Sequence, residues 1–364
     1  MEKKDLLFDV LKEPFRHARI SAGSKPILAV LPGYFPDELI ASGGAHPVHV
    51  WGGRVDTVRA DAALQSYICS MAKAVLEDVL DGTLDFAAGF VVPSVCDTMQ
   101  NMSDLISSTG RKVFCFRAPR TSFDEEAGKW LALEVARFNS WIKGVTGKSP
   151  DESSLKVEAG KSQARQDAMK KMYSVRAENP GLLPPDLFYG ILRASWVVTP
   201  DETTALIKDV LEGATGTGRN IGKRVVVSGT APIPSGFLKE FDEAGLAISD
   251  DDLMAGRRTV MKPVLKSFST GDIFESFLGG DPCPSIVHGH DNRPAHIAGL
   301  VEKSKAVGVV FWQTKACENE AFDLPWVVGE LRTRGIKTVV VETEQKMRTF
   351  ETAASRLSAF AEGL

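Results

Sequence analysis

Three of the five cysteines in this chain stand where a thiol can take part in chemistry. Cys96 follows the apolar run FVVPSV, Cys317 follows the run VGVVFWQT, and each precedes a segment with helical spacing of apolar residues. A thiol between a strand and a helix lies at the carboxyl edge of a parallel sheet, where backbone N–H groups and the helix dipole stabilise a thiolate. Cys69 lies 27 positions before Cys96, near the start of another helical segment. Three thiolates that converge on one cleft would suit an iron–sulfur cluster.

Spacing alone leaves a second interpretation open. A cysteine outside a disulfide is often a small buried hydrophobic residue, and the chain has no CxxC pair. We expect Cys115, within the β-type run KVFCF, to belong to a core, and Cys283, in GDPCPS, to lie on a loop without a role. Five cysteines in 364 residues do not indicate a disulfide framework.

Histidine provides the candidate proton donors. His46 and His49 flank Pro47-Val48 near an expected strand end, so either one could donate a proton in the cleft or form a structural hydrogen bond. His288 and His290 precede Asp291, but no spaced zinc motif is present, so we interpret them as part of a solvated loop or a substrate contact.

Charged residues near position 250 allow several interpretations. The segment SDDDLMAGRR places Asp250–Asp252 at a strand end. There they could cap a helix, line the cleft or be solvated. Arg257 and Arg258 could contact a phosphate-bearing substrate. The nearby segment GATGTGRNIGKR (213–224) resembles a phosphate loop but lacks the GxxxxGK[ST] order and precedes a strand, so we predict no ATP site.

Short apolar runs that alternate with helical segments must position these residues. Helical spacing runs without interruption from Asp61 to Gly82, and long charged helices without strand candidates fill the region from Ser122 to Asn179. The pattern predicts an α/β fold of two Rossmann-like or flavodoxin-like lobes with mainly parallel sheets, joined by a helical segment. The expected parts are 1–121, 122–189 and 190–364, and the expected strands lie within 25–33, 46–53, 84–95, 112–119, 223–229, 246–252, 307–314 and 337–344.

Composition excludes several classes of protein. A formal net charge of −4 and the lack of a basic, aromatic-rich cluster argue against nucleic-acid or anionic-membrane partners. The first residues lack the apolar core of a secretory signal, and no run approaches 18 apolar residues. We therefore expect a soluble cytoplasmic protein.

Several stretches resemble the catalytic subunits of 2-hydroxyacyl-CoA dehydratases and benzoyl-CoA reductases, and the resemblance covers nearly the whole chain. The QSYIC and PSVCD pieces look most similar to the smaller cluster-bearing subunit of ATP-dependent benzoyl-CoA reductase. The stretches are GYFPDELIASGGAHPVHVWGG, QSYICS with FVVPSVCDTMQNMS, LKEFDEAGLAISDDDLMAGRR, and AVGVVFWQTKACENEAFDLPWVVGELRTRGIKTVVVETE with the closing SRLSAFAEG.

The resemblance implies a [4Fe–4S] cluster held by three cysteines per subunit, which correspond to Cys69, Cys96 and Cys317. It also implies a separate ATP-hydrolysing iron–sulfur activator that supplies one electron at low potential, which the cluster passes to an acyl-CoA thioester. Three thiolates leave one iron open to water, hydroxide or substrate. Because the family pairs two different subunits, we expect a paralogous second subunit in a heterodimer.

The function expected from this resemblance is low-potential one-electron reduction of an acyl-CoA of the benzoyl-CoA reductase type, with reduction of the aromatic ring. The alternatives are a (R)-2-hydroxyacyl-CoA dehydratase subunit that works through a ketyl radical, a non-catalytic electron-relay subunit, and a cluster-free two-lobed binding protein. Glu38 is similar in position to an acid near the active site of some relatives, although a first-turn acid of a helix is its simpler interpretation. Glu38 and His46 are the candidate catalytic residues. The KAC sequence at Cys317 departs from the more usual aromatic–Cys–Asp.

Overall fold

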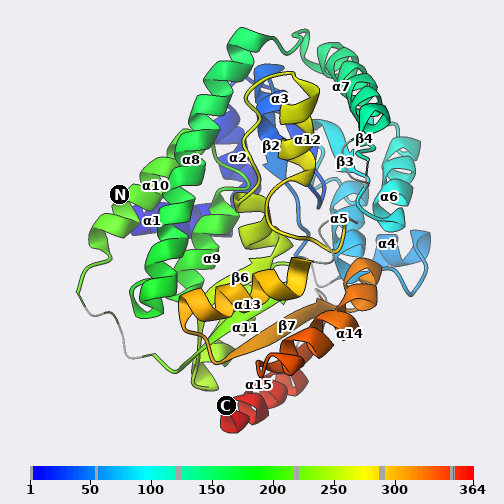
Figure 1. The fold of residues 1–364 in the computed structure, drawn as a ribbon. Coiled ribbons are helices and arrows are strands. Elements are labelled where there is room, and N and C mark those ends of the chain that lie inside the picture. Colours follow the sequence, from blue (N-terminus) through cyan, green and yellow to red (C-terminus); the bar gives the residue numbers. More distant parts are fainter. Residues whose placement is uncertain are drawn as a thin grey trace.

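The computed structural model shows two lobes, each built on a parallel sheet (Figure 1). The structure describes residues 3–53, 56–119, 124–216, 218, 221–286, 292–344, 347 and 349–364. His288, His290 and Asp291 lie outside the described residues, so the expectation for them stays a prediction.

Each sheet has four strands in the same spatial order, β2-β1-β3-β4 in the first lobe and β6-β5-β7-β8 in the second. All pairings are parallel, which confirms the predicted fold class. The first sheet consists of β1 (Ile27–Val30), β2 (His46–His49), β3 (Ala87–Pro93) and β4 (Val113–Phe116). The second consists of β5 (Lys223–Gly229), β6 (Leu246–Leu253), β7 (Gly308–Thr314) and β8 (Lys337–Thr343).

This shared strand order defines where each lobe can hold a ligand. In both sheets the second strand lies on one side of the first strand, and the third strand lies on the other side. The connections leaving the carboxyl ends of β1 and β3, and likewise of β5 and β7, therefore diverge and leave a crevice between them. Doubly wound sheets bind ligands at this switch point.

Helices cover both sheets. The first lobe has α1 (Lys3–Lys12), α2 (Pro14–Ala22), α3 (Asp37–Ser42), α4 (Val58–Ala63), α5 (Ser70–Leu80) and α6 (Asp97–Ser108). The second has α11 (Ser235–Glu243), a short π-helical turn η2 (Met254–Arg258), α12 (Thr270–Leu278), α13 (Arg293–Ser304), α14 (Glu318–Thr333) and α15 (Glu351–Gly363). Among the described residues, no helix is both long enough and apolar enough to cross a membrane.

A helical segment joins β4 of the first sheet to β5 of the second. It contains α7 (Glu125–Thr146), α8 (Glu152–Glu178), a 3-10 turn η1 (Pro180–Leu182), α9 (Pro185–Ala194) and α10 (Pro200–Gly213). Local sequence defines where these helices begin, because Asp124, Asp151 and Thr199 each accept a backbone N–H of the first turn. The boundaries of the three predicted parts stay a prediction.

One local expectation was wrong. The helical pattern between Asp61 and Gly82 is broken into α4 and α5 by a turn in which Ile68 N–H bonds the Gln65 carbonyl, and Cys69 is the extended residue before α5. The helix α12 lies in a stretch for which the sequence pattern led to no prediction. It packs on α7 and on the first sheet, where Phe277 stacks on Phe116 with ring centroids 4.1 Å apart.

Candidate functional site

Each of the three predicted ligand cysteines is the residue directly before a helix. Cys69 precedes α5, Cys96 precedes α6 and Cys317 precedes α14, as expected from the sequence for the last two. Cys96 lies three residues after the end of β3, and Cys317 lies three residues after the end of β7. Because β3 and β7 occupy equivalent places in their sheets, the two lobes present these thiols from equivalent switch points.

The thiol of Cys69 is close enough to the other two thiols for a negative charge on one sulfur to raise the pKa of another. Burial raises the pKa of Cys69 to about 11, and the nearby thiol of Cys96 adds to the shift, while backbone N–H groups of the first turn of α5 oppose it. Burial likewise raises the pKa of Cys317 well above its usual range, helped by Glu320 and by Cys69. The thiol of Cys317 lies 3.9 Å from the Thr230 hydroxyl, at the end of β5.

The donor set therefore matches an iron–sulfur cluster in ligand type and in placement at helix N-termini. No group of three or more His, Cys, Asp or Glu side chains stands in position to hold a metal ion within the described part of the chain. Assignment of the three thiols as ligands stays a prediction. Cys115 is half-buried on β4. Cys283 is buried, and the Arg258 guanidinium donates to its sulfur at 3.8 Å.

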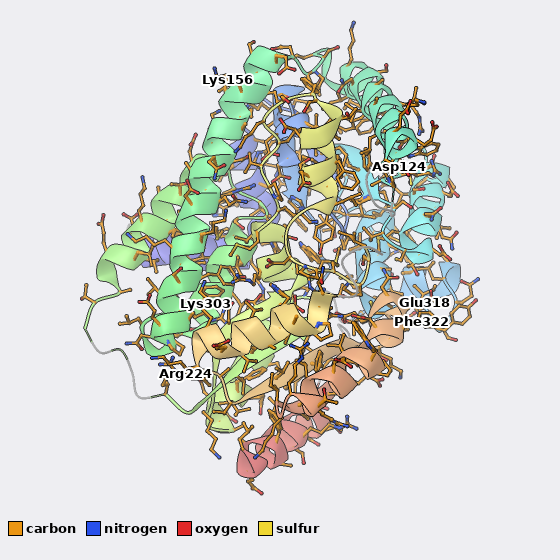
Figure 2. All side chains as sticks on the ribbon, viewed as in Figure 1. Asp124, Lys156, Arg224, Lys303, Glu318 and Phe322 are labelled. Atoms are coloured by element: carbon orange, nitrogen blue, oxygen red, sulfur yellow. The ribbon has the colours of Figure 1, made fainter. Side chains whose placement is uncertain are left out.

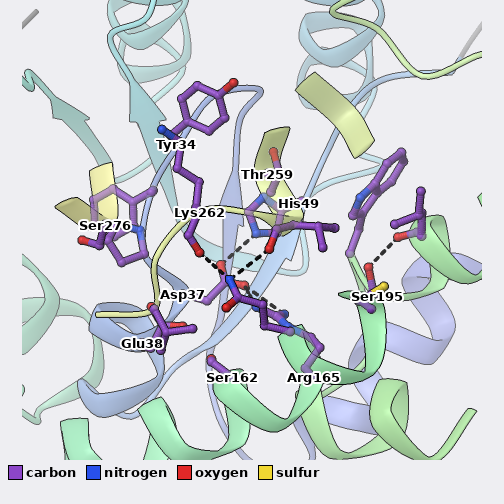
Figure 3. Close-up of a pocket in the computed structure, with 18 of the residues that line it drawn as sticks. Tyr34, Asp37, Glu38, His49, Ser162, Arg165, Ser195, Thr259, Lys262 and Ser276 are labelled. Atoms are coloured by element: carbon purple, nitrogen blue, oxygen red, sulfur yellow. Dashed lines mark hydrogen bonds and ion pairs between the residues drawn. The ribbon is translucent and has the colours of Figure 1, made fainter. Parts of the chain in front are cut away.

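A pocket with both polar and apolar lining residues lies between the lobes, with a cavity volume of about 100 Å³ (Figure 3). We call it the Glu38 pocket. Residues after β1, on α8 and on the segment after β6 meet there, so both lobes and the helical segment contribute. Its polar lining comprises Tyr34, Asp37, Glu38, His49, Ser162, Arg165, Gln166, Ser195, Thr259, Lys262 and Ser276.

Glu38 is a buried carboxyl group in this pocket. Burial raises its pKa, and neighbouring Asp37 adds to the shift, whereas Ser162 and Arg165 oppose it. A buried carboxyl group with a raised pKa can exchange protons with a ligand. The catalytic role of Glu38 stays a prediction.

The two candidate histidines have different surroundings. The Nε2 of His46 lies 2.8 Å from the Val197 carbonyl in a buried position, and burial lowers the pKa of His46. His46 does not line the Glu38 pocket. His49 does, and its Nε2 lies 2.8 Å from Asp37 Oδ1, with Arg165 pairing to the other Asp37 oxygen at 3.2 Å. The predicted role of His46 is untested, and His49 is the histidine that faces the pocket.

Tyr34 separates the Glu38 pocket from a smaller pocket. Ser94 and Val95, in the loop that leads from β3 to Cys96, line this smaller pocket, and we call this loop the cysteine loop. The Tyr34 ring lines both pockets, and its hydroxyl points away from Asp37 and Arg165 (Figure 3). The Lys262 ammonium lies 4.2 Å from the centre of the Tyr34 ring and donates to the Phe277 and Gly279 carbonyls, while burial lowers the pKa of Lys262 to about 8. Sequence analysis did not single out Tyr34 or Lys262, because each depends on contacts between distant segments.

The acids and arginines near position 250 are buried and paired. The carboxylates of Asp250, Asp251 and Asp252 are 1% exposed or less. Because side chains alternate along a strand, Asp251 faces α8 and pairs with Arg176 at 3.3 Å, while Asp250 and Asp252 face the other side. There Asp250 pairs with Arg257 at 3.3 Å and Asp252 pairs with Arg258 at 2.7 Å and Arg293 at 3.4 Å. These arginines are engaged inside the protein, which removes the main support for a phosphate contact.

Taken together, the geometry defines a class: a two-lobed α/β protein with one thiol-bearing switch point per lobe and a pocket between the lobes. Comparison with known proteins agrees. Residues 32–364 match the family model described as 2-hydroxyglutaryl-CoA dehydratase, D-component. The chain belongs to this family, as the sequence resemblance predicted.

Three relatives match along almost their whole length. The chain is 24% identical to the (R)-phenyllactyl-CoA dehydratase beta subunit of Clostridium sporogenes, over 99% of this chain and 97% of the relative. It is 28% identical to the beta subunit of (R)-2-hydroxyglutaryl-CoA dehydratase of Acidaminococcus fermentans (95% and 94%). It is 21% identical to a benzoyl-CoA reductase subunit of Thauera aromatica (94% and 91%).

Proposed function

We propose that this chain is the cluster-bearing subunit of a 2-hydroxyacyl-CoA dehydratase, with Cys69, Cys96 and Cys317 as the ligands of a [4Fe–4S] cluster. The supporting observation is that three thiols from two lobes stand directly before three helix N-termini, two of them at equivalent positions after β3 and β7. The names of the family model and of two of the three relatives above support dehydration as the proposed reaction.

The residues of the chain have distinct tasks in this proposal. A bound cluster would supply one electron at low potential to the acyl-CoA thioester. The N-termini of α5, α6 and α14 stabilise the negative charge on the three sulfurs. Glu38 exchanges a proton with the substrate in the pocket, and Tyr34 and Lys262 close the wall between this pocket and the cysteine loop. Closure excludes water from a reactive intermediate.

The proposal includes the partners implied by the family: an acyl-CoA substrate, a paralogous second subunit and a separate ATP-hydrolysing iron–sulfur activator. A cytoplasmic location and a heterodimer belong to the same proposal. The Glu38 pocket is smaller than an acyl-CoA, since an acyl group alone fills a volume of this order. The remaining parts of the substrate therefore extend beyond the pocket.

Anaerobic purification tests the cluster. We expect a brown protein with broad absorption near 400 nm and about four irons per chain. Replacement of Cys69, Cys96 or Cys317 by serine should remove most of the iron and the activity measured with the second subunit and activator. Cys115→Ser and Cys283→Ser are the matched controls and should keep both. A colourless wild-type protein after anaerobic reconstitution, or loss of iron in the Cys115 variant alone, would contradict the assignment.

Ring reduction of the benzoyl-CoA type is the second candidate, favoured by the match to the benzoyl-CoA reductase relative. The electron balance separates the two reactions. Elimination of water from a 2-hydroxyacyl thioester is redox-neutral, so one injected electron supports many turnovers. Reduction of an aromatic ring consumes two electrons and two protons per product. Measuring reductant consumed per product, with 2-hydroxyacyl-CoA and benzoyl-CoA supplied in turn, decides between them: two electrons per product from benzoyl-CoA would overturn the dehydratase proposal.

A further inference from the structure

One side chain bridges the two lobes beside the cysteines. Asn319 lies in the first turn of α14, two residues after Cys317. Its Nδ2 donates to the Val95 carbonyl at 3.0 Å and to the Ser285 hydroxyl at 2.9 Å. Val95 belongs to the first lobe and directly precedes Cys96, so the bridge joins the approaches to two of the three thiols.

The chemistry of the amide suits this bridge. A side-chain amide nitrogen carries two hydrogens, and both are used here. The acceptor on Val95 is a backbone carbonyl. This bond therefore holds the backbone before Cys96 in place, whatever the rotamer of the Val95 side chain. A carboxylate at position 319 would face the same carbonyl with an acceptor and lose this bond.

Both ends of the bridge are anchored to strand ends. On the first lobe, Val95 N–H bonds the Pro93 carbonyl at the last residue of β3. On the second lobe, Cys317 N–H bonds the Thr314 carbonyl at the last residue of β7, through a turn in which Ala316 has a φ of 60°. A left-handed alanine is held only where surrounding contacts over-determine the turn. A short chain of bonds therefore connects β3 to β7.

We infer that Asn319 is a positioning residue that holds the Cys317 thiol at a defined distance from Cys96 and closes the cleft between the lobes at this point. Its chemical purpose rests on the proposed function, since a cluster with ligands from two lobes requires that the lobes keep their separation. The geometric claim concerns the protein alone and can be tested without iron.

The test uses the full-length chain after removal of bound metal. The rate of iodoacetamide alkylation is measured by peptide mass spectrometry at Cys317 and at Cys115, which lies outside the bridge on β4. We expect Asn319→Ala to speed alkylation of Cys317 about 5- to 30-fold, at about fivefold for each hydrogen bond lost, without change at Cys115. Ser285→Ala removes one bond and should give about fivefold or less.

Asn319→Asp isolates the bond to Val95, because an aspartate can still accept from Ser285 but cannot donate to the carbonyl. It loses one hydrogen bond, so it should speed alkylation of Cys317 about fivefold, less than Asn319→Ala. A Cys317 rate within twofold of wild type in both Asn319 variants would overturn the inference. Equal acceleration at Cys115 would also overturn it, because that result indicates general loosening.

The loaded protein gives a second readout. Iron release to a chelator should be faster in Asn319→Ala and Asn319→Asp than in wild type, in the same order as the alkylation rates. The outcomes distinguish this inference from the proposed function. If the wild-type chain binds no iron but the variants show the expected alkylation rates, the proposed cluster is wrong and the inference about Asn319 is supported. If the chain binds iron but the Asn319 variants have unchanged alkylation rates, the inference about Asn319 is wrong and the proposed cluster is supported.

Discussion

Two buried acids on β6, Asp250 and Asp252, have pKa values shifted in opposite directions. Burial raises the pKa of Asp250 to about 6, and the adjacent Asp251 adds to the shift, although Arg257 opposes it. Burial also acts on Asp252, but Arg258 and Arg293 outweigh it and hold the pKa of Asp252 below its usual range. Asp250 has one arginine partner, Arg257 at 3.3 Å, whereas Asp252, two positions further along the strand, has two, Arg258 at 2.7 Å and Arg293 at 3.4 Å. The carboxyl group of Asp250 therefore resists ionisation, and that of Asp252 is ionised.

The first prediction concerns Asp250. Its raised pKa means that the folded state binds a proton more tightly than the unfolded chain between about pH 4 and pH 6. This contribution to stability is present below about pH 4 and is lost as pH rises through about 6. Asp250→Asn, which stays neutral, should raise the free energy of unfolding at pH 7.5 by up to about 3 kcal/mol and leave it nearly unchanged at pH 4. Urea unfolding at both pH values measures this.

Asp252→Asn is the matched change with the opposite sign. The lowered pKa of Asp252 contributes stability above about pH 4, which is lost as pH falls below that value. Replacement leaves the buried Arg258 without its carboxylate partner, while Arg293 keeps Asp323, so the free energy of unfolding at pH 7.5 should fall by about 3–5 kcal/mol. The loss should shrink as pH falls below 4. Equal effects of the two substitutions at pH 7.5 would contradict this account.

Among the elements, α12 is a second-lobe segment that packs against the first lobe. Phe277 stacks on Phe116 and also contacts Phe35 edge-on, with ring centroids 5.4 Å apart. Lys262 donates to the carbonyls of Phe277 and Gly279 at the end of α12. The aromatic contacts and the hydrogen bonds from Lys262 together hold α12 against the first lobe. Lys262 also lines the Glu38 pocket.

Removal of the stacked ring tests how far α12 stabilises the molecule. Phe277 is 1% exposed, so Phe277→Ala should lower the free energy of unfolding by about 3–5 kcal/mol through lost burial and a cavity. Phe322, on the outer face of α14 beside Glu318 (Figure 2), is 85% exposed. Phe322→Ala should change the free energy by less than about 0.5 kcal/mol. Denaturant unfolding compares the two, and a similar small loss in both would show that α12 is weakly seated.

Across the whole molecule, α8 connects the lobes through polar side chains on the face that it packs against them. Arg165 pairs with Asp37 after β1, Gln166 donates to the Val260 and Lys262 carbonyls, and Arg176 pairs with Asp251 on β6. Arg176 also donates to the Ile248 carbonyl and lies 3.9 Å from the centre of the Phe188 ring. One helix therefore contacts α3 of the first lobe and β6 of the second, and Figure 1 shows it running beside both lobes.

The two arginines of α8 should differ in energetic weight. Arg176 is fully buried, and Arg176→Met would leave the Asp251 carboxylate without its ion pair inside the protein, at a cost of about 3–5 kcal/mol in the free energy of unfolding. The Arg165 side chain is 22% exposed, and Asp37 keeps His49 as a partner, so Arg165→Met should cost only about 1 kcal/mol. Urea unfolding measures both, and a larger loss for Arg165 would refute this ranking.

Most of the architecture could be predicted from local patterns. Alternating apolar runs predicted all eight strands and the parallel α/β class, because strand and helix periodicity are written in consecutive residues. The same patterns placed Cys96 and Cys317 between strand and helix. They missed the break before Cys69 and the helix α12, since apolar spacing alone did not show where a turn interrupts a helix or where a short helix forms within a loop.

By itself, the sequence determined the two sheets, the equivalent cysteine positions and, through its resemblance, the family. Only the tertiary structure decided what surrounds them: that Asn319 reaches Val95 across 224 positions, that Arg176 meets β6 across 72, and that three consecutive aspartates are buried and not solvated. The physical reason is that periodicity records which face of an element is apolar. The partner of a buried polar group is chosen by how distant elements pack, and local spacing does not encode it.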